Sequence, residues 1–416
     1  MAPWSAERAR ARGVSAMRAR GGGATRAPTA LGATFSASSM FSIIVSRTQR
    51  LDVGPESLFS KSWLVVEDID RLTRGIKMAK GAPDSVALLL FFVFWYAGNM
   101  KYNEYNTGAL NAVGGKTAGM TMTVSTFQLI VCAAYAFVVW IVGYNPIKLC
   151  GLQAPEKQSV PKLTMGDVKA TIPVGVCSAG AHSSSVFALG GDPLFGQIVK
   201  AGEPVVSAVV NTVFYGKAPT LTKALCLPVI VGGVAFASLK KGPTGAYGLK
   251  FDQTALLFGM IANAFAAFKG SENKKLMDAK GIKDRFAGVG NQFAVTEILA
   301  ALVSVPVMLA TEGDKLGDFI NLCMTSKALQ FNLCASGLTF YLYNELATMT
   351  IKQTGPVTSS VANTAKRVIV MVYMAAVTGK VLTEEQKIGA AVAIGGVLLY
   401  SVIDDLLKPK KKGKAA

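Results

Sequence analysis

Ten long runs of mostly apolar residues fill the chain between residues 85 and 407. Each run is long enough to cross a hydrocarbon layer of ~30 Å as a helix. Charged residues make up only 16% of the chain, whereas a soluble protein usually carries ~25%. We therefore predict an all-α integral membrane protein with ten transmembrane helices. The predicted spans are residues 85–109, 120–143, 167–189, 192–216, 221–240, 252–276, 284–311, 327–351, 355–379 and 383–407.

The positive charge lies mostly outside these runs. The net charge of +18 is concentrated in the two ends of the chain and in a few loops, among them 144–166, 217–220 and 269–286. Charge in such places follows the positive-inside rule, whereas nucleic-acid binding requires basic residues on a folded soluble surface. We therefore expect no nucleic-acid partner. Because ten spans return the chain to its starting side, we expect both termini on the cytosol-like, stromal or matrix side of the membrane.

The first 50 residues have the composition of an organelle transit peptide. They contain eight Arg, seven Ser and a single acidic residue, Glu7, and they lack the apolar segment of a secretory signal. The alternative is a disordered basic tail that stays attached. Residues 51–84 carry apolar side chains at near-helical spacing among charges, which predicts an amphipathic linker on the membrane surface. Residues 408–416 are predicted to form a basic C-terminal tail.

A short pattern recurs at a single offset of 163 residues. The pattern Gly216-Lys217, Thr220, Gly232-Gly233-Val234 and Ser238 returns as Gly379-Lys380, Thr383, Gly395-Gly396-Val397 and Ser401. The offset maps the fourth span onto the ninth and the fifth onto the tenth. A unit of five helices enters the membrane in opposite directions in its two copies, which predicts two inverted repeats, residues 85–245 and 246–407, with a substrate site between them. The alternative is a chance likeness between apolar segments.

Two of the predicted spans carry cations near the middle of an apolar run: Lys200 lies in the fourth span, and Lys366 and Arg367 lie in the ninth. A cation at the centre of a membrane helix costs at least ~2.5–3.5 kcal/mol on insertion scales. The repeat offset maps Lys200 onto position 363, about one helical turn from Lys366, so we expect the three cations to face one cavity. Phosphate esters are dianions that bind through several charge-assisted donors. Neutralisation of Lys200 by Glu203 is the alternative, but one acid cannot compensate three cations.

Other polar residues in the spans have two interpretations each. His182 and Tyr343 could hydrogen-bond the carbon part of a phosphorylated ligand, or they could be satisfied core residues. Lys101 and Glu104, in a polar stretch of the first span, indicate either a gate or the exit of the helix from the bilayer. The sequence lacks nucleotide-binding loops and nucleophile–base sets, so we expect no enzyme, no catalytic residue and no cofactor. We expect no metal site either, because His182 is the only histidine.

Five motifs carry a family resemblance over about residues 85–405. They are W-Y-A-G-N-M-K-Y-N-E-Y-N (95–106), G-Q-I-V-K-A-G-E-P (196–204), Y-L-Y-N-E-L-A (341–347), A-N-T-A-K-R (362–367) and G-G-V-L-L-Y-S (395–401). The sequence resembles the plastid phosphate translocators, of the triose-phosphate/phosphate type, in the drug/metabolite transporter superfamily. The resemblance implies ten helices in two inverted halves. It also implies obligate exchange of inorganic phosphate for triose phosphate, 3-phosphoglycerate or a related small phosphorylated metabolite across the plastid (chloroplast) inner envelope.

The resemblance also implies roles for single residues. Lys200, Lys366 and Arg367 would hold the phosphate, and His182 and Tyr343 the carbon part of the substrate. The sequence departs from the family pattern at Thr107, where lysine is typical, at Lys101, where an apolar residue is usual, and in the stretch 182–200, which is one residue short.

Two other functions stay open at this point. One is a nucleotide-sugar antiporter of the same superfamily, and the other is a non-transporting membrane scaffold. The expected partners are small phosphorylated metabolites, inorganic phosphate and membrane lipid. We expect a monomer or a weak homodimer.

Overall fold

The computed structural model describes residues 84–143, 158–241, 247–249, 251–354 and 356–407. All of them lie in one compact unit, Thr73–Ala416. The predicted transit peptide, the amphipathic linker up to residue 83 and the C-terminal tail lie outside the described residues.

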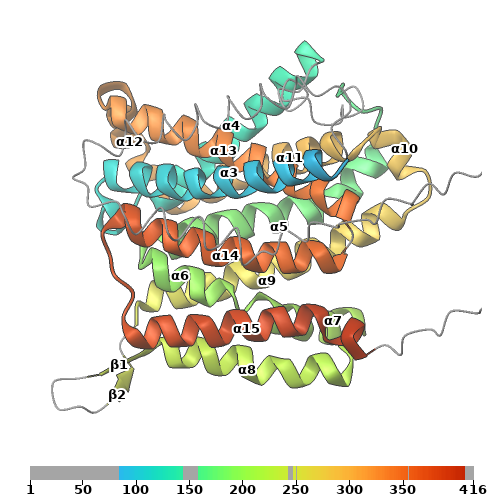
Figure 1. Ribbon diagram of the computed structural model, residues 1–416. Coiled ribbons are helices and arrows are strands. Elements are labelled where there is room, and N and C mark those ends of the chain that lie inside the picture. Colours follow the sequence, from blue (N-terminus) through green and yellow to red (C-terminus); the bar gives the residue numbers. More distant parts are fainter. Residues whose placement is uncertain (1–83, 144–157, 242–246, 250, 355, 408–416) are drawn as a thin grey trace, which may run out of the picture. The chain divides into compact units, whose positions relative to one another are not determined.

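The longer helices follow the apolar runs of the sequence (Figure 1). They are α3 (Asp84–Ala112), α4 (Thr121–Val142), α5 (Met165–Gly190), α6 (Pro193–Lys200), α7 (Glu203–Tyr215), α8 (Leu221–Ala237), α9 (Gln253–Asp278), α11 (Val289–Glu312), α13 (Lys327–Thr354), α14 (Pro356–Thr378) and α15 (Glu384–Leu407). The connections hold η1 (Gly115–Ala118), α10 (Ile282–Phe286), η3 (Gly313–Lys315), α12 (Leu316–Thr325) and the antiparallel strands β1 (Leu239–Lys241) and β2 (Tyr247–Leu249).

The protein is a helical membrane protein. Among the described residues, six helical segments are long and apolar enough to cross a membrane. They are Thr121–Val142, Met165–Gly190, Gln253–Asp278, Val289–Thr325, Val361–Thr378 and Glu384–Asp404. Helix α8 is apolar but shorter, and the fourth predicted span is divided between two short helices.

The fourth predicted span is interrupted rather than continuous. Helix α6 ends at Lys200, a turn at residues 201–202 follows, and α7 begins at Glu203. Pro204 lies in the first turn of α7, where proline costs no helical hydrogen bond. The break places Lys200 in the last turn of a helix, where a cation is favoured by the helix dipole.

The predicted basic loop over residues 269–286 overlaps the predicted span 252–276 and is shorter in the structure. Helix α9 continues to Asp278, so Lys269 lies inside a helix. A separate short helix, α10, follows, and its Ile282 and Phe286 are buried. Arg285 of α10 donates two hydrogen bonds to Asp167 at the start of α5, at 2.7 and 2.6 Å. Burial of apolar side chains among the basic residues therefore keeps this segment folded against the bundle.

The helices α8 and α15 lie side by side at one edge of the bundle (Figure 1). A Cβ atom at Gly233 of α8 would overlap the backbone of Ala393, and one at Gly396 of α15 would meet Ile230 at 2.8 Å. Their neighbours Gly232 and Gly395 face open space. One glycine of each repeated Gly-Gly pair therefore lets the two helices approach closely.

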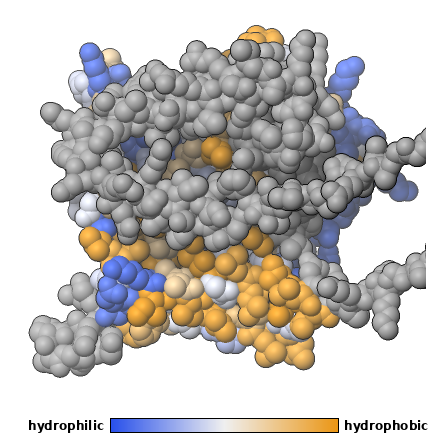
Figure 2. Space-filling view, viewed as in Figure 1, coloured by the Kyte–Doolittle hydropathy of each residue, from blue (hydrophilic) through white to orange (hydrophobic). Residues whose placement is uncertain are grey.

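The outward surface of this helix pair is apolar. Figure 2 shows hydrophobic side chains gathered over α8 and α15. Val229 and Val231 of α8 and Val392 and Leu399 of α15 are among the exposed large apolar residues. Such a surface is suited to lipid tails rather than to water.

Candidate functional site

Lys200 reaches across to helix α5. Its Nζ atom donates a hydrogen bond to Oγ of Ser185 at 3.1 Å. Glu203 is not its hydrogen-bond partner, although it follows three residues later. The hydrogen bond of the Lys200 ammonium group is therefore made to a different helix rather than to the nearby carboxylate.

Glu203 instead forms an ion pair with Arg367. The guanidinium group of Arg367 donates to Oε2 of Glu203, and its side chain is only 9% exposed. The pair joins α7 to α14, residues 164 positions apart. A buried cation of this kind requires a partner, because an unpaired one would lose its hydration without compensation.

Lys366 lies against aromatic rings. Its ammonium group is 5.1 Å from the ring centroid of Trp95 and 5.8 Å from that of Tyr343, the geometry of a cation–π contact. Lys366 precedes Arg367 on α14, and Arg367 pairs with Glu203, which follows Lys200 by three residues. The structure therefore brings the three predicted cations together. Three positive charges and the one negative charge of Glu203 leave +2, which matches the charge of a phosphate dianion.

His182 is buried and oriented by Gln128. The amide nitrogen of Gln128 donates to Asn106 and Ser336, both at 2.9 Å, so its oxygen faces His182 Nε2 at 3.0 Å. Nε2 must then be the protonated nitrogen of the neutral ring. Nδ1 has no hydrogen-bond partner among the described residues. A ligand hydroxyl could therefore donate to it.

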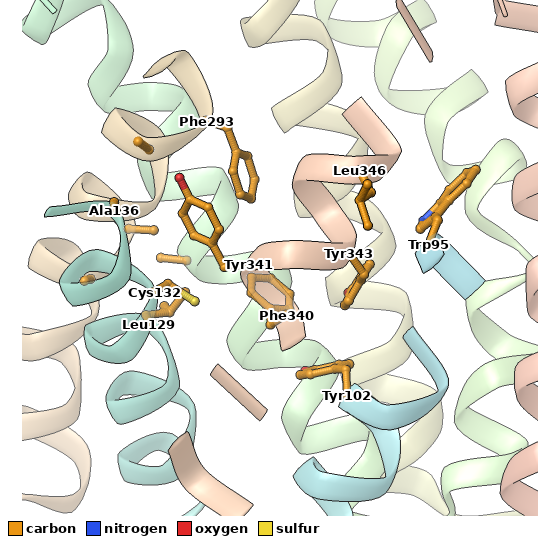
Figure 3. Packing of buried hydrophobic residues seen from close by; sticks show 14 of the residues in the cluster. Trp95, Tyr102, Leu129, Cys132, Ala136, Phe293, Phe340, Tyr341, Tyr343 and Leu346 are labelled. Carbon is orange, nitrogen blue, oxygen red and sulfur yellow. The ribbon is translucent and has the colours of Figure 1, made fainter. Parts of the chain in front are cut away.

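Tyr343 connects the histidine to the cations. Figure 3 shows Tyr343 and Phe340 close together on α13, with Tyr102 of α3 near both. The ring centroid of Phe340 is 5.7 Å from that of Tyr343 and 4.2 Å from that of His182. A row of packed aromatic rings thus extends from Lys366 to His182, and the five predicted site residues lie in one region.

Three more polar residues join this region, and sequence reasoning missed them. Lys269 of α9 and Glu297 of α11 form an ion pair with Nζ and Oε1 3.6 Å apart, and Ser178 of α5 lies between them. Ser178 precedes His182 by four residues on α5, so this ion pair lies about one helical turn from the histidine. The available signal was Glu297, an isolated carboxylate inside an apolar run, which by itself indicates a functional position.

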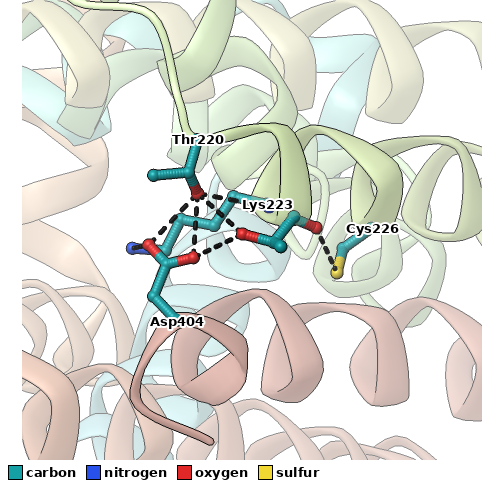
Figure 4. Close-up of polar contacts among 5 residues, drawn as sticks. Thr220, Lys223, Cys226 and Asp404 are labelled. Carbon is teal, nitrogen blue, oxygen red and sulfur yellow. Dashed lines mark hydrogen bonds and ion pairs between the residues drawn. The ribbon is translucent and has the colours of Figure 1, made fainter. Parts of the chain in front are cut away.

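A cavity of about 600 Å³ extends to Glu203, the ion-pair partner of Arg367, and the three cations are not among its lining residues. It lies between α7, the C-terminal parts of α9 and α15 and the start of α8, with Lys217 and Lys274 among its other lining residues. Figure 4 shows one wall, where Asp404 of α15 accepts a hydrogen bond from Thr220 at 2.8 Å and lies 3.3 Å from Nζ of Lys223. These contacts hold the start of α8 against the end of α15. The cavity gives one possible approach to the Glu203–Arg367 pair.

A helical membrane protein with grouped internal cations and a broken helix beside them has the features of a transporter for anions. The chain matches the Triose-phosphate Transporter family over residues 86–401, and it belongs to that family. The predicted resemblance is thereby confirmed, and the chain is a membrane transporter rather than an enzyme.

Similar proteins include three chloroplastic translocators. The triose phosphate/phosphate translocator of Zea mays is 29% identical over 332 residues, covering 78% of this chain and 73% of the relative. The phosphoenolpyruvate/phosphate translocator 3 of Oryza sativa subsp. japonica is 28% identical over 325 residues, covering 77% and 76%. The glucose-6-phosphate/phosphate translocator 1 of Arabidopsis thaliana is 27% identical over 324 residues, with the same two coverages.

Proposed function

We propose that this protein exchanges inorganic phosphate for triose phosphate, 3-phosphoglycerate or a related small phosphorylated metabolite across a plastid envelope membrane. The observation that carries the proposal is the grouping of Lys200, Lys366 and Arg367 around one region. The three relatives are named for phosphate and for three different phosphorylated partners. Phosphate is common to all three names. This agrees with a site in which the same cations bind the phosphate group whatever the rest of the substrate is. The chloroplastic relatives and the Arg- and Ser-rich first 50 residues support the location.

The cations bind the phosphate group of either substrate. Arg367 offers a planar pair of donors, and the two lysines act as point charges from α6 and α14. Beyond the phosphate, Nδ1 of His182 accepts a hydrogen bond from a hydroxyl of the carbon part, and Tyr343 forms the floor beneath it. No group in this scheme forms a covalent bond, so the cycle consists of binding, conformational change and release.

The fold supports ten spans in two inverted halves, residues 85–245 and 246–407. Exchanging the halves maps α3 onto α9, α5 onto α13 and α7 onto α14, while α4 and α11, and α8 and α15, exchange with each other. The observed packing is unchanged by this operation: α3 packs on α13 as α9 packs on α5, and α14 packs on α3 as α7 packs on α9. Ten spans place both termini on one side of the membrane. A single chain contains all the proposed site residues, so a monomer or a weak homodimer is sufficient for transport.

Similar polar clusters join the helices at each end of the site. Between α3 and α14, Glu104 accepts hydrogen bonds from Tyr373 and, at 2.8 Å, from Lys101. Between α9 and α7, Glu272 accepts them from Tyr215 at 2.5 Å and from Lys275 at 3.0 Å. Under the proposed topology these clusters lie toward opposite membrane faces. When one cluster opens and the other stays closed, the site is exposed to one side of the membrane at a time, which is alternating access. Lys101 then belongs to one of the two gates.

Tyr373→Phe and Tyr215→Phe are expected to shift the carrier in opposite directions. Each substitution removes one hydrogen bond to a carboxylate, worth ~1.5–3 kcal/mol, and so favours opening at its own end. In proteoliposomes with a single protein orientation, half-saturation by phosphate is measured on each side. The ratio of the two values should rise in one variant and fall in the other by roughly tenfold. The control is Tyr105→Phe, which keeps the ring that lies 5.9 Å from Nζ of Lys101 and removes no hydrogen bond to Glu104 or Glu272. A shift in the same direction for both variants would contradict the two-gate mechanism.

A competition experiment tests the proposed function itself. Purified protein is reconstituted in liposomes loaded with phosphate, and uptake of labelled phosphate is challenged with triose phosphate, 3-phosphoglycerate, phosphoenolpyruvate or a nucleotide sugar. We expect competition by small phosphate esters and no uptake into liposomes without internal substrate. Competition by the nucleotide sugar alone would indicate a nucleotide-sugar antiporter. Absence of all uptake would favour a non-transporting scaffold.

A further inference from the structure

One face of helix α5 carries three polar residues that connect two charged groups. Ser178, His182 and Ser185 are spaced i, i+4 and i+7, so they form one stripe. Ser185 accepts from Lys200 at the phosphate end, whereas Ser178 contacts Lys269 and Glu297. Seven residues of α-helix correspond to ~10 Å, so the distance between the two charged groups is comparable to the length of a small sugar phosphate.

The second charged group is a tight cluster. Nζ of Lys269 donates to Oγ of Ser178 at 2.8 Å, and Ser178 donates to Oε1 of Glu297 at 2.8 Å. The Glu297 side chain is 0% exposed, and its second carboxylate oxygen has no hydrogen-bond partner among the described residues. Lys269 is 32% exposed, so it is the member of the pair that a ligand can reach. Nζ also lies 5.9 Å from the ring centroid of Phe293, which fixes the ammonium group on that side.

The charge of this cluster determines which ligand end it accepts. Lys269 alone would attract a carboxylate, but Glu297 cancels its charge from a position buried behind it. An uncharged hydroxyl or carbonyl can still accept a hydrogen bond from the Lys269 ammonium group. A carboxylate would gain the same bond and meet the repulsion of Glu297 at low dielectric.

We propose that the Lys269–Glu297 pair is a specificity element that selects phosphate esters with an uncharged carbon end, such as triose phosphate, against esters that carry an additional carboxylate. This inference rests on the proposed phosphate exchange and narrows its substrate class. His182 and Ser178 would contact the hydroxyl and carbonyl oxygens between the two charged groups. Lys269 then positions the far end of the substrate, while Lys200, Lys366 and Arg367 hold the phosphate.

The first measurement uses the unmodified protein. Half-inhibition of phosphate self-exchange is determined for triose phosphate and for 3-phosphoglycerate at pH 8, where the carboxylate and the phosphate of the latter are both ionised. We expect triose phosphate to compete better by roughly tenfold. Equal competition, or stronger competition by 3-phosphoglycerate, would overturn the inference while leaving phosphate exchange established. Loss of phosphate self-exchange itself would be a failure of the proposed function instead.

Charge variants give the second measurement. Glu297→Gln keeps the shape of the side chain and frees the charge of Lys269, so the preference for triose phosphate should fall by roughly tenfold. Adding Lys269→Met to this variant removes both charges and should restore the preference. Glu384→Gln, an exposed carboxylate that pairs with Lys387, is the control and should change neither value. An unchanged preference in Glu297→Gln would overturn the inference.

Discussion

Replacing Lys200 by alanine is expected to reduce phosphate exchange by roughly 100-fold, because charge-assisted hydrogen bonds are worth ~1.5–3 kcal/mol and the dianion loses one of three cations. The cation is also the only one of the three contributed by the first half of the chain, so its loss removes the contact of that half with the phosphate group. The measurement is counter-exchange of labelled phosphate by the purified variant in liposomes, normalised to the amount of inserted protein.

Two further variants define what this loss means. Ser185→Ala removes only the hydrogen-bond partner of the Lys200 ammonium group, so exchange should fall by roughly fivefold. Lys387→Ala removes an exposed lysine at the start of α15 and should leave exchange unchanged. Full exchange by Lys200→Ala would refute the assignment of the phosphate site.

Arg367→Ala is expected to abolish exchange as well, but this variant also leaves Glu203 without its ion-pair partner. Breaking such a pair destabilises a protein by ~3–5 kcal/mol, which could mimic a loss of binding. The double variant with Glu203→Gln removes that complication. Its failure to exchange phosphate, together with unchanged thermal unfolding, would show that the guanidinium group itself is required for binding.

Replacing Gly233 by leucine is expected to destabilise the helix bundle by roughly 3 kcal/mol, the upper range for overpacking a core. The new side chain would meet the backbone of α15 at Ala393, which cannot rotate away as a side chain can. The helices α8 and α15 would have to separate. The measurement is the midpoint of thermal unfolding in detergent, with the fraction of monodisperse protein as a second value.

The adjacent glycine provides a matched control. Gly232→Leu makes the same chemical change one position earlier, where nothing lies within 4 Å of the added Cβ atom. We expect its unfolding midpoint to match that of the unmodified protein, since the leucine extends the apolar outer surface. Equal destabilisation by both substitutions would argue that helix propensity, rather than close packing, sets the requirement for glycine.

Much of the helical framework was predictable because apolar runs and membrane spans have the same length. The described helices follow the apolar runs, although the fourth run is divided between two helices and six segments are long and apolar enough to cross a membrane. The break after Lys200 was not predictable in this way, since the two short helices together form one apolar run. Helix α12, and helix α10 at the end of the predicted basic loop, were missed for a related reason. Hydropathy separates membrane from water, but it does not separate a polar helix from a polar loop.

The cations of the site were predictable from the energetic cost of placing charge inside a membrane helix. Cations inside apolar runs are costly wherever they lie, so Lys200, Lys366 and Arg367 could be selected without any tertiary information. Their partners could not. Glu203 was considered as a partner for its near neighbour, whereas it pairs with Arg367 in the other half of the chain. Gln128, which orients His182, has no distinguishing local pattern, and only the packing of α4 against α5 brings the two together.

The ion pair between Glu203 and Arg367 has a consequence for how fast substrate leaves. The Glu203 carboxylate competes with incoming phosphate for the same guanidinium group. Phosphate must displace it, so the net binding free energy is smaller and the residence time of the ligand is shorter. A carrier that works by rapid turnover benefits from such weak binding. The same carboxylate leaves two cations uncompensated when the site is empty, which keeps unloaded slippage slow. One acidic side chain therefore balances rapid release against tight coupling.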